Sequence, residues 1–271
     1  MEKISASIVT YQNDIVVLIK VVAKLLEKEN LILYVIDNSP TNEIERAFVG
    51  ERVTYMHNPS NPGFGAAHNL AITKATAAGS SFHFIINPDI HINGDVIGPM
   101  VCYMQNHPDV GMLMPQILNE DGSIQYLPKL LPTPFWIFRR KLKKFDLNHA
   151  SFINKYELRD ISQDKIYNAP ILSGCFTLLN LVAVNEIGGY DDKFFMYFED
   201  FDLSRRMHKK YKTIYYPEVT VYHGYEGGAN KNARLFKIFV ASAITYFNKW
   251  GWIFDSERRL INKKTLEQFE K

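Results

Sequence analysis

Apolar strand patterns alternate with helical patterns through the first ninety residues of this chain. Residues 4–9 and 31–36 are continuous apolar runs rich in β-branched side chains, as in strands buried on both faces. Between them, apolar residues recur at helical spacing after Asp14, a good helix cap. Further strands are predicted at 53–57 and 82–86, and an alanine-rich helix at 66–78. Strands separated by helices predict an α/β fold with a mostly parallel central sheet flanked by helices.

Polar side chains follow the ends of these predicted strands. In a parallel sheet the ligand cleft lies beyond the carboxyl ends of the strands, so these residues are expected to meet at one rim. Asp37 at that rim can accept hydrogen bonds from a base N–H or a ribose hydroxyl, although an Asx-turn explains it equally well. The rim residues are Thr10, Tyr11, Asp37, Asn38, Asn87 and Asp89.

Composition excludes several other classes of protein. The 271 residues are 46% hydrophobic and 22% charged, with a formal net charge of +2, so nothing global indicates nucleic-acid binding. Two cysteines, Cys102 and Cys175, are too few for a disulfide framework or a zinc cluster and are predicted to be small core residues. The N-terminus lacks the basic start and long apolar run of a signal peptide, and no apolar stretch reaches the ~18 residues of a membrane span. A cytoplasmic location is therefore expected.

Three carboxylates lie within four positions, directly after a run of aromatic residues and Met at 194–198. In a helix, Asp202 lies three and four positions before Arg205 and Arg206, so an arginine is expected to pair with it. Glu199 or Asp200 is then left to face a cleft, where aromatic walls raise the pKa of a carboxylate toward that of a general base. The alternative is an ordinary first turn of a helix, where acidic residues are favoured by the helix dipole.

Two further segments are candidate parts of a binding site. Residues 61–69 open a helix with Gly63 and Gly65, and small residues at a helix N-terminus suit an anion such as a diphosphate. Tight helix–sheet packing explains these glycines equally well, and the segment lacks the Gly-Lys-Ser/Thr of a P-loop. Asp89 can contribute one oxygen to Mg²⁺ or Mn²⁺ on a nucleotide diphosphate, and His223, after a strand at 219–222, can add a second ligand. A lone histidine is, however, more often structural.

The second half of the chain is less regular. A helix near 96–105, strands at 110–118 and 171–179, and a helix at 232–250 are predicted. Residues 119–168 contain prolines and the basic cluster 139–144, and are expected to form a long, partly mobile excursion. Three parts are therefore expected: a nucleotide-binding half at 1–90, an acceptor-binding and catalytic half of the same domain at 91–228, and a helical extension at 229–271.

The last predicted helix mixes basic residues with aliphatic and aromatic ones. Such a surface suits an anionic membrane, so peripheral contact at the inner face of a membrane is one interpretation. Packing on the main domain, or against a second copy as a homodimer, is the alternative. The basic residues concerned are Lys231, Arg234, Lys237, Lys249, Arg258 and Arg259.

Taken together, these motifs resemble the family 2 glycosyltransferases of the GT-A fold, a Rossmann-like α/β fold. The chain looks most like bacterial rhamnosyltransferases that build O-antigen, capsule or cell-wall polysaccharide. The resemblance covers residues 4 to about 225, and neither 119–168 nor 231–271 contributes a motif. It rests on 7–11, 35–39, 61–69, 87–90, 173–176, 189–191, 195–203 and 221–223.

The resemblance implies an inverting transfer of a sugar, with L-rhamnose from dTDP-rhamnose favoured, to a glycan or a lipid-linked saccharide. It implies that Asp200 is the catalytic base, with Glu199 as the alternative holder of that role. It also implies that Asp89 and His223 bind Mg²⁺ or Mn²⁺. Asn87 stands where the family has the first Asp of its Asp-x-Asp motif, which leaves fewer charges on the cation.

The same resemblance implies a binding role for the remaining motif residues. Those for the donor nucleotide are Thr10, Tyr11, Asp37, Asn38, Gly63, Gly65, Asn69 and Asn87. Those for the acceptor are Ser173, Gly174 and Tyr197.

Two other functions compete with this prediction. A sugar-nucleotide pyrophosphorylase resembles a pattern with a glycine-rich loop and a basic residue just after the first strand, and residues 10–14 have neither. An inactive relative that serves as a carbohydrate-binding or scaffold subunit would be favoured by loss of Asp89, Asp200 or His223, but all three are present. Nucleic acid is not expected as a partner, because a solvated loop explains the basic cluster at 139–144 better.

Overall fold

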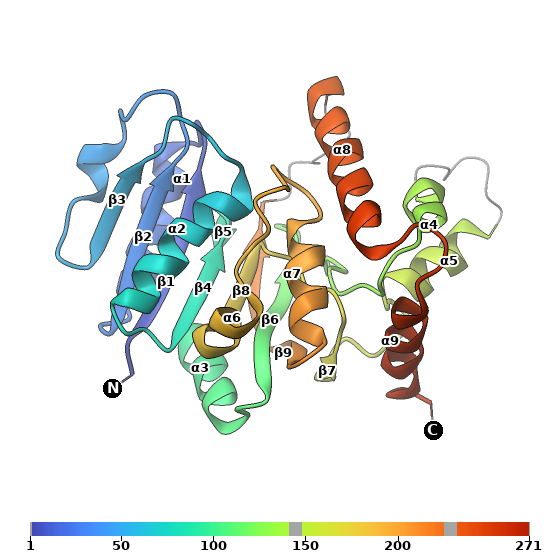
Figure 1. Cartoon of the computed structure of the whole chain (residues 1–271). Helices are drawn as coiled ribbons and strands as arrows, with labels where there is room; N and C mark the ends of the chain where they lie inside the picture. Colours follow the sequence, from blue (N-terminus) through green and yellow to red (C-terminus); the bar gives the residue numbers. More distant parts are fainter. Residues whose placement is uncertain (1, 141–147, 225–231, 271) are drawn as a thin grey trace.

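A computed structural model describes residues 2–140, 148–224 and 232–270 of the chain. Within these residues, one open sheet of nine strands forms the centre of the molecule, with strand order β3-β2-β1-β4-β8-β6-β9-β5 and with β7 paired to β9 (Figure 1). The strands are β1 (Ile4–Thr10), β2 (Leu31–Asp37), β3 (Val53–His57), β4 (Phe82–Ile86), β5 (Ile90–His91), β6 (Val110–Leu118), β7 (Tyr167–Asn168), β8 (Phe176–Asn180) and β9 (Lys212–His223). The predicted α/β class is confirmed.

Helices lie on both faces of the sheet. Figure 1 shows α2, α6 and α7 in front of the strands and α1 behind them, while α4, α5, α8 and α9 gather beyond one side of the sheet. The helices are α1 (Ile15–Leu26), α2 (Phe64–Ala77), α3 (Ile97–Asn106), α4 (Pro134–Arg139), α5 (His149–Tyr156), α6 (Leu181–Ile187), α7 (Glu199–His208), α8 (Ala233–Trp250) and α9 (Ser256–Glu267), with a 3₁₀ turn, η1 (Glu45–Phe48).

The first half of the sheet is parallel and brings the predicted rim together. Strand β1 pairs in parallel with β2 and β4, and β2 pairs in parallel with β3. In this register Thr10 lies opposite Asp37, and Asp37 lies opposite His57, so the carboxyl ends of three strands meet. Asp14 caps α1 by accepting a hydrogen bond from Val16 N. Local sequence patterns therefore predicted this half well.

The second half contains antiparallel pairs, which the sequence pattern did not predict. Strand β8 runs antiparallel to both β4 and β6, whereas β6 and β9 are parallel. The strand expected at 171–179 begins only at Phe176, because backbone donors before it bond to side chains from other elements. Leu172 N donates to Ser204 Oγ (3.2 Å), and Ser173 N donates to Met114 Sδ (3.3 Å).

Two further expectations need correction. Cys175 is buried as predicted, but Cys102 is exposed on α3 and is not a core residue. Within the excursion at 119–168, the described residues form α4, α5 and β7. Lys141, Lys143 and Lys144 of its basic cluster lie outside the described residues, as does Lys231.

The C-terminal segment packs on the main domain. Tyr246 and Phe247 of α8 are buried in an aromatic cluster with Phe194 and Phe198. Packing on the domain, one of the alternatives for this segment, is therefore observed, while contact with a membrane or a second copy stays a prediction. No helix in the described ranges is both long and apolar enough to cross a bilayer.

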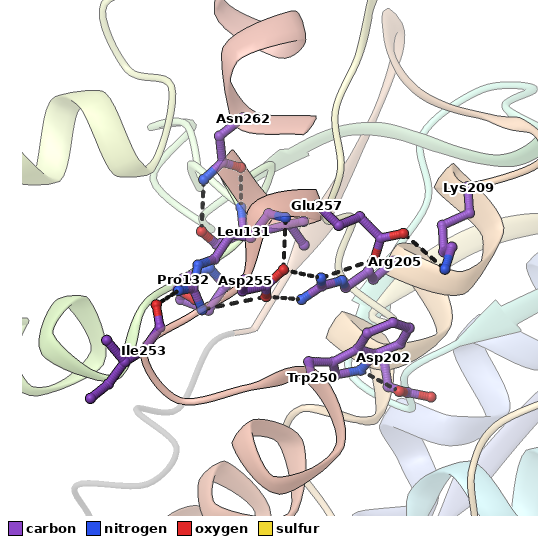
Figure 2. Close-up of polar contacts among 11 residues, drawn as sticks. Leu131, Pro132, Asp202, Arg205, Lys209, Trp250, Ile253, Asp255, Glu257 and Asn262 are labelled. Carbon is purple, nitrogen blue, oxygen red and sulfur yellow. Dashed lines mark hydrogen bonds and ion pairs between the residues drawn. The ribbon is translucent and has the colours of Figure 1, made fainter. Parts of the chain in front are cut away.

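Beyond α8 the chain is attached through a buried ion pair. The guanidinium of Arg205 on α7 donates to both carboxylate oxygens of Asp255, each at 2.8 Å (Figure 2). Asn262 of α9 exchanges two hydrogen bonds with the backbone of Leu131. A helical extension is predicted at 229–271, but only the helix at 232–250 has predicted bounds, and α9 is not among the predicted helices.

Candidate active site

Asp89 and His223 meet because the two-residue strand β5 pairs with the end of β9. Ile90 lies opposite His223 in this antiparallel pair, so the preceding Asp89 is held beside the imidazole. Asp89 Oδ1 lies 3.4 Å from His223 Nε2. Asn87 Nδ2 lies 3.2 Å from the same nitrogen. Asp89 and Asn87, both distant from His223 in sequence, thus converge on one of its ring nitrogens.

Gln125, which sequence reasoning missed, orients His223. Its Nε2 donates to Asn119 Oδ1 (2.8 Å) and to the backbone oxygen of His223 (2.9 Å), which directs Gln125 Oε1 toward the imidazole. His223 Nδ1 lies 3.0 Å from that oxygen. Since the amide oxygen can only accept, this network assigns the proton to Nδ1 and makes Nε2 an acceptor facing Asp89.

The Asp89–His223 pair has the donor chemistry of a partial site for a divalent cation. It combines a carboxylate oxygen with an imidazole nitrogen, and the other nitrogen of that ring is held by a side chain of a neighbouring segment. In the part of the chain that the structure describes, no three His, Cys, Asp or Glu side chains form a metal-binding group. The pair therefore fits a cation that takes most of its oxygens from a ligand, as Mg²⁺ on a nucleotide diphosphate does.

Asp200 lies in the first turn of α7. Its Oδ1 accepts a hydrogen bond from Phe201 N (2.9 Å), and the backbone of Gly174 also donates to the carboxylate. Burial raises the pKa of Asp200 to about 6, while these hydrogen bonds and the nearby Lys129 ammonium oppose the rise. A carboxylate with this pKa is ionised at neutral pH and remains basic enough to accept a proton.

Glu199 has a different environment from its neighbour. Its side chain is buried, and no described residue bonds to its Oε2. Burial, together with the charge of Asp200, raises the pKa of Glu199 well above its ordinary value. The environment therefore favours the protonated, uncharged form of Glu199. Asp202, by contrast, is ion-paired with Arg206 (2.8 Å), which confirms the expected arginine partner for one acid.

The backbone before α7 is strained. Tyr197 and Phe198 both have positive φ angles, +70° and +65°, which aromatic residues rarely adopt. Rings from α8 enclose the turn, with Phe239 centred 5.8 Å from Tyr197 and Tyr246 5.5 Å from Phe198. This packing holds Glu199 and Asp200 at the end of a defined turn.

The segment 173–175 connects the base to the Asp89–His223 pair. Asn87 N donates to Cys175 O (2.8 Å), while Gly174 donates to Asp200. A Cβ at Gly174 would lie 3.3 Å from the Phe64 ring and 3.7 Å from Asp200 Cβ, which shows how closely the segment approaches the base. Ser173, predicted with Gly174 as an acceptor residue, uses its carbonyl to accept from Thr177 Oγ1.

A smaller pocket of about 360 Å³ lies at the parallel rim. Four of the predicted donor residues line it: Thr10, Tyr11, Asn38 and Gly63. Arg234, at the start of α8, also lines it and places a cation there. In the sequence, Arg234 is only one of the basic residues of the last predicted helix, for which membrane contact and packing are the alternatives, because no local pattern places α8 beside this rim.

Asp37 lies beneath this rim rather than in the pocket lining. It is only 1% exposed, and its oxygens accept hydrogen bonds from Tyr55 Oη (2.6 Å) and Ser39 N (2.9 Å). The second contact is the Asx-turn that was the alternative interpretation. Contact between Asp37 and a base stays a prediction.

Asn69 and Gly65 serve contacts with the loop at 189–192. The Asn69 amide donates to Tyr190 O (2.8 Å) and Asp192 Oδ1 (2.9 Å), and it accepts from Tyr190 N (2.9 Å). A Cβ at Gly65 would lie 2.7 Å from Tyr190 Cβ. The structure thus gives these two residues packing contacts, and neither lines the pocket at the rim.

A larger pocket of about 590 Å³ lies on the other side of Asp200. Glu199, Asp200 and Tyr197 form one wall, and Gln125, which contacts His223, lies on another. Most of the remaining lining residues come from the excursion at 119–168, which contains no motif of the resemblance. The pocket is therefore lined by both the start of α7 and the excursion, and Gln125 links its lining to His223.

Residues 5–188 match the sequence profile of the glycosyl transferase family 2. Among curated proteins, the N-acetylglucosaminyl-diphospho-decaprenol L-rhamnosyltransferase of Mycobacterium tuberculosis is 26% identical over 209 residues, 69% of this chain and 64% of the relative. The rhamnosyltransferase WbbL of Escherichia coli K12 is 22% identical over 214 residues, 76% of this chain and 75% of the relative. The match thus spans less than two thirds of the mycobacterial relative.

Solved structures share the fold. The structure of GalNAc-T7 with UDP, GalNAc and Mn²⁺ aligns with a TM-score of 0.67 at 15% identity, covering 95% of this chain and 50% of that one. The mannosyltransferase PcManGT of Pyrobaculum calidifontis, in complex with GDP-Man and Mn²⁺, aligns with a TM-score of 0.57 at 15% identity, covering 90% and 64%. At these identities the likeness shows the GT-A fold alone.

Proposed function

The chain belongs to glycosyl transferase family 2, and on that premise we propose that it transfers a sugar from a nucleotide diphosphate donor to a saccharide hydroxyl. One observation carries the proposal: Asp200, a carboxylate with a pKa of about 6, lines a large pocket and accepts a hydrogen bond from Gly174. The segment 173–175 also contacts the loop that contains Asp89, through the hydrogen bond from Asn87 N to Cys175 O. A base and a place for a diphosphate at one crevice are what this reaction requires.

The proposed reaction is an inverting single displacement. Asp200 accepts the proton of the acceptor hydroxyl as that oxygen bonds to the anomeric carbon and the bond from this carbon to the diphosphate oxygen breaks. Burial of Glu199 disfavours a second negative charge beside the reacting oxygen. Asp89 and His223 would hold a divalent cation, Mg²⁺ or Mn²⁺, which when bound stabilises charge on the leaving diphosphate.

We infer the donor site from the pocket at the rim. Thr10, Tyr11 and Asn38 line it and would contact the nucleoside, and Arg234 would add charge beside the diphosphate. In this proposal residues 1–90 form the nucleotide-binding half and residues 91–228 the acceptor-binding half. Residues 229–271 form the helical extension.

The donor and acceptor are proposed from the relatives. Two relatives are rhamnosyltransferases, which favours L-rhamnose from dTDP-rhamnose as the donor. The name of the mycobacterial relative specifies an acceptor sugar linked through a diphosphate to a lipid, so we propose a lipid-linked saccharide as the acceptor.

A thermal-shift panel tests the donor site first. Each of dTDP, UDP, GDP and CMP is added with and without Mn²⁺, because a ligand that binds only the folded state raises its melting temperature with affinity. We expect dTDP with Mn²⁺ to give the largest shift. Incubation with dTDP-rhamnose and N-acetylglucosaminyl diphosphate bearing a short alkyl chain should then yield a disaccharide with inverted anomeric configuration. No nucleotide-dependent shift and no product with any donor would reject the function.

A further inference from the structure

A basic cluster lines the large pocket that Glu199 and Asp200 also line. Its members are Lys129 before α4, Arg140 at the end of α4, and Glu157 and Arg159 after α5, and all four line the pocket. They come from the excursion, which matches none of the family motifs. None of the four has a role in the proposed proton transfer or in binding the cation.

Glu157 organises the two arginines. Its side chain is 7% exposed, and its Oε1 accepts from Arg140 Nη2 (3.1 Å) while its Oε2 accepts from Arg159 Nε (2.9 Å). Arg159 also stacks over the Tyr126 ring at 4.7 Å. The side chains of Arg140 and Arg159 are about a third exposed or more, and their guanidinium groups have further N–H donors for a ligand in the pocket.

Lys129 is the buried member of the cluster. The residue is only 7% exposed, and its ammonium donates to the backbone oxygens of Tyr126 (3.0 Å) and Leu127 (3.1 Å). No described residue takes its third N–H. Burial lowers the pKa of Lys129 to about 8, with the Glu157 carboxylate opposing that shift, so the side chain is mostly charged at neutral pH.

The charges of this cluster do not cancel. Three cations face one carboxylate within the cluster, which leaves a balance of two positive charges, and Asp200 lines the same pocket. A sugar joined to a lipid through a diphosphate carries about two negative charges, one on each phosphate, and guanidinium groups bind phosphate oxygens in bidentate pairs.

We propose that Lys129, Arg140 and Arg159 bind the diphosphate of the acceptor and thereby place the hydroxyl of its sugar at Asp200. The rings of Tyr197 and Phe239 also line the pocket and offer apolar surface to a sugar. This inference rests on the proposed function, since it specifies the acceptor of that same site. Glu157 is a positioning residue that keeps both guanidinium groups aimed into the pocket.

Calorimetry on the full chain tests the inference with matched ligands. One ligand is N-acetylglucosaminyl diphosphate with a short alkyl chain, and the other is the uncharged alkyl glycoside of the same sugar. We expect the wild-type protein to bind the diphosphate compound at least about tenfold more tightly. Arg140→Gln with Arg159→Gln should remove this preference, whereas Arg139→Gln, at the neighbouring position outside the pocket lining, should retain it. Equal binding of the two ligands by the wild type, or a preference that survives in the double variant, would overturn the inference.

Two further experiments use only the wild-type protein, so they do not require any variant to fold. In the wild type, added NaCl should weaken binding of the diphosphate compound and leave the uncharged glycoside unchanged. Inorganic pyrophosphate identifies the source of the anion: we expect it to compete weakly, and binding as tight as that of the sugar compound would indicate a free-anion site and contradict the acceptor assignment.

The nucleotide panel separates this inference from the proposed function. If the double variant loses the preference and still binds dTDP with Mn²⁺ like the wild type, the defect lies in the acceptor pocket. If no donor nucleotide binds the wild type but the preference is present, the proposed function fails while the anion site stands.

Discussion

Asp200 and Glu199 are neighbours in sequence whose side chains have different environments. Asp200 lines the pocket, accepts backbone hydrogen bonds and lies near Lys129, whereas Glu199 is buried with one oxygen unpaired by any described residue. Adjacent carboxyls whose environments separate their pKa values mark a division of roles. Here the environment favours Asp200 as the base.

Substitution of each acid separates their roles. We expect Asp200→Asn to reduce kcat by about 10²-fold to 10⁴-fold, because an amide cannot accept the proton, with dTDP affinity unchanged. Glu199→Gln keeps a neutral group in place and should retain most activity. Steady-state kinetics with calorimetry of dTDP measures both, and a reversed order of the two variants would assign the base to Glu199.

The rate should follow the ionisation of Asp200. Because its pKa is about 6, kcat/KM for the acceptor should rise about tenfold per pH unit below pH 6 and level off above pH 7. A flat profile between pH 5 and 7, measured with the chemical step limiting, would remove Asp200 from proton transfer.

The same shift has a consequence for stability. The folded-state pKa of Asp200 is raised above its unfolded value, so its favourable contribution at acidic pH is lost as pH rises through about 6. Asp200→Asn should therefore raise Tm at pH 7.5 by roughly 2–6 °C relative to wild type, and by less at pH 4. A difference in Tm that does not depend on pH would contradict this account.

Gln125 offers a test of the cation site that does not rely on turnover. Gln125→Leu removes the acceptor that fixes the His223 tautomer and should weaken Mn²⁺ binding in the presence of dTDP by about 10-fold to 100-fold. Gln125→Glu restores an acceptor on Nδ1 and should bind Mn²⁺ at least as well as wild type. Electron paramagnetic resonance of free Mn²⁺ reports both, with Gln105→Leu on α3 as the control. Equal affinity of Gln125→Leu and wild type would show that Gln125 does not orient the ligand.

At the scale of elements, the start of α2 meets the loop before α7. Phe64 N donates to Phe195 O (2.8 Å), and a Cβ at Gly63 would lie 2.1 Å from that oxygen. The α2 N-terminus therefore positions the aromatic loop that leads into the strained turn at 197–198. This contact connects the pocket at the parallel rim to the turn that precedes Asp200.

A comparison of two glycines with positive φ separates the cost of backbone strain from the cost of the clash with Phe195 O. Gly63 (φ +105°) and Gly79 (φ +76°) both disfavour a side chain, but a Cβ at Gly79 meets no heavy atom within 4 Å. We expect Gly79→Ala to cost about 1 kcal/mol in the free energy of unfolding and Gly63→Ala about 3 kcal/mol or more, with a loss of transfer activity. Urea unfolding measures both, and equal costs would exclude a contribution from the contact with Phe195.

At the scale of the whole molecule, the C-terminal segment completes the site. Rings of α8 enclose the turn before Asp200, and Arg234 lines the pocket at the parallel rim. The Arg205–Asp255 pair anchors this segment to α7, and Trp250 lies over the Arg205 guanidinium at 4.2 Å (Figure 2).

Breaking that pair should destabilise the protein strongly. Asp255→Ala leaves Arg205, which is 1% exposed, without its main partner and should cost about 3–5 kcal/mol. Glu186→Ala breaks an exposed pair with Lys210 and should cost about 0–1 kcal/mol. Chemical unfolding compares them, and replacing both members, as Arg205→Met with Asp255→Leu, should recover part of the loss. A small cost for Asp255→Ala would show that the segment is not anchored through this pair.

Local patterns determined the parallel half of the fold and the positions of the candidate base and cation ligands. Strands β1 to β4 were predictable because each is a short apolar run bounded by turn residues, and parallel pairing then sends their carboxyl ends to one rim. Asp89, Asp200 and His223 were recognisable as motifs. Sequence spacing alone did not place them relative to one another.

Tertiary structure decided what surrounds those residues. Gln125 contacts His223, and Arg234 lines the pocket at the parallel rim, only because distant segments pack together. For the same reason Lys129 lines the large pocket with Arg140 and Arg159. Asn69 and Gly65 contact Tyr190 for the same reason. The physical cause is that burial and charge pairing depend on neighbours in space, so no local pattern records whether a carboxyl is desolvated, an imidazole oriented or a guanidinium aimed at a pocket.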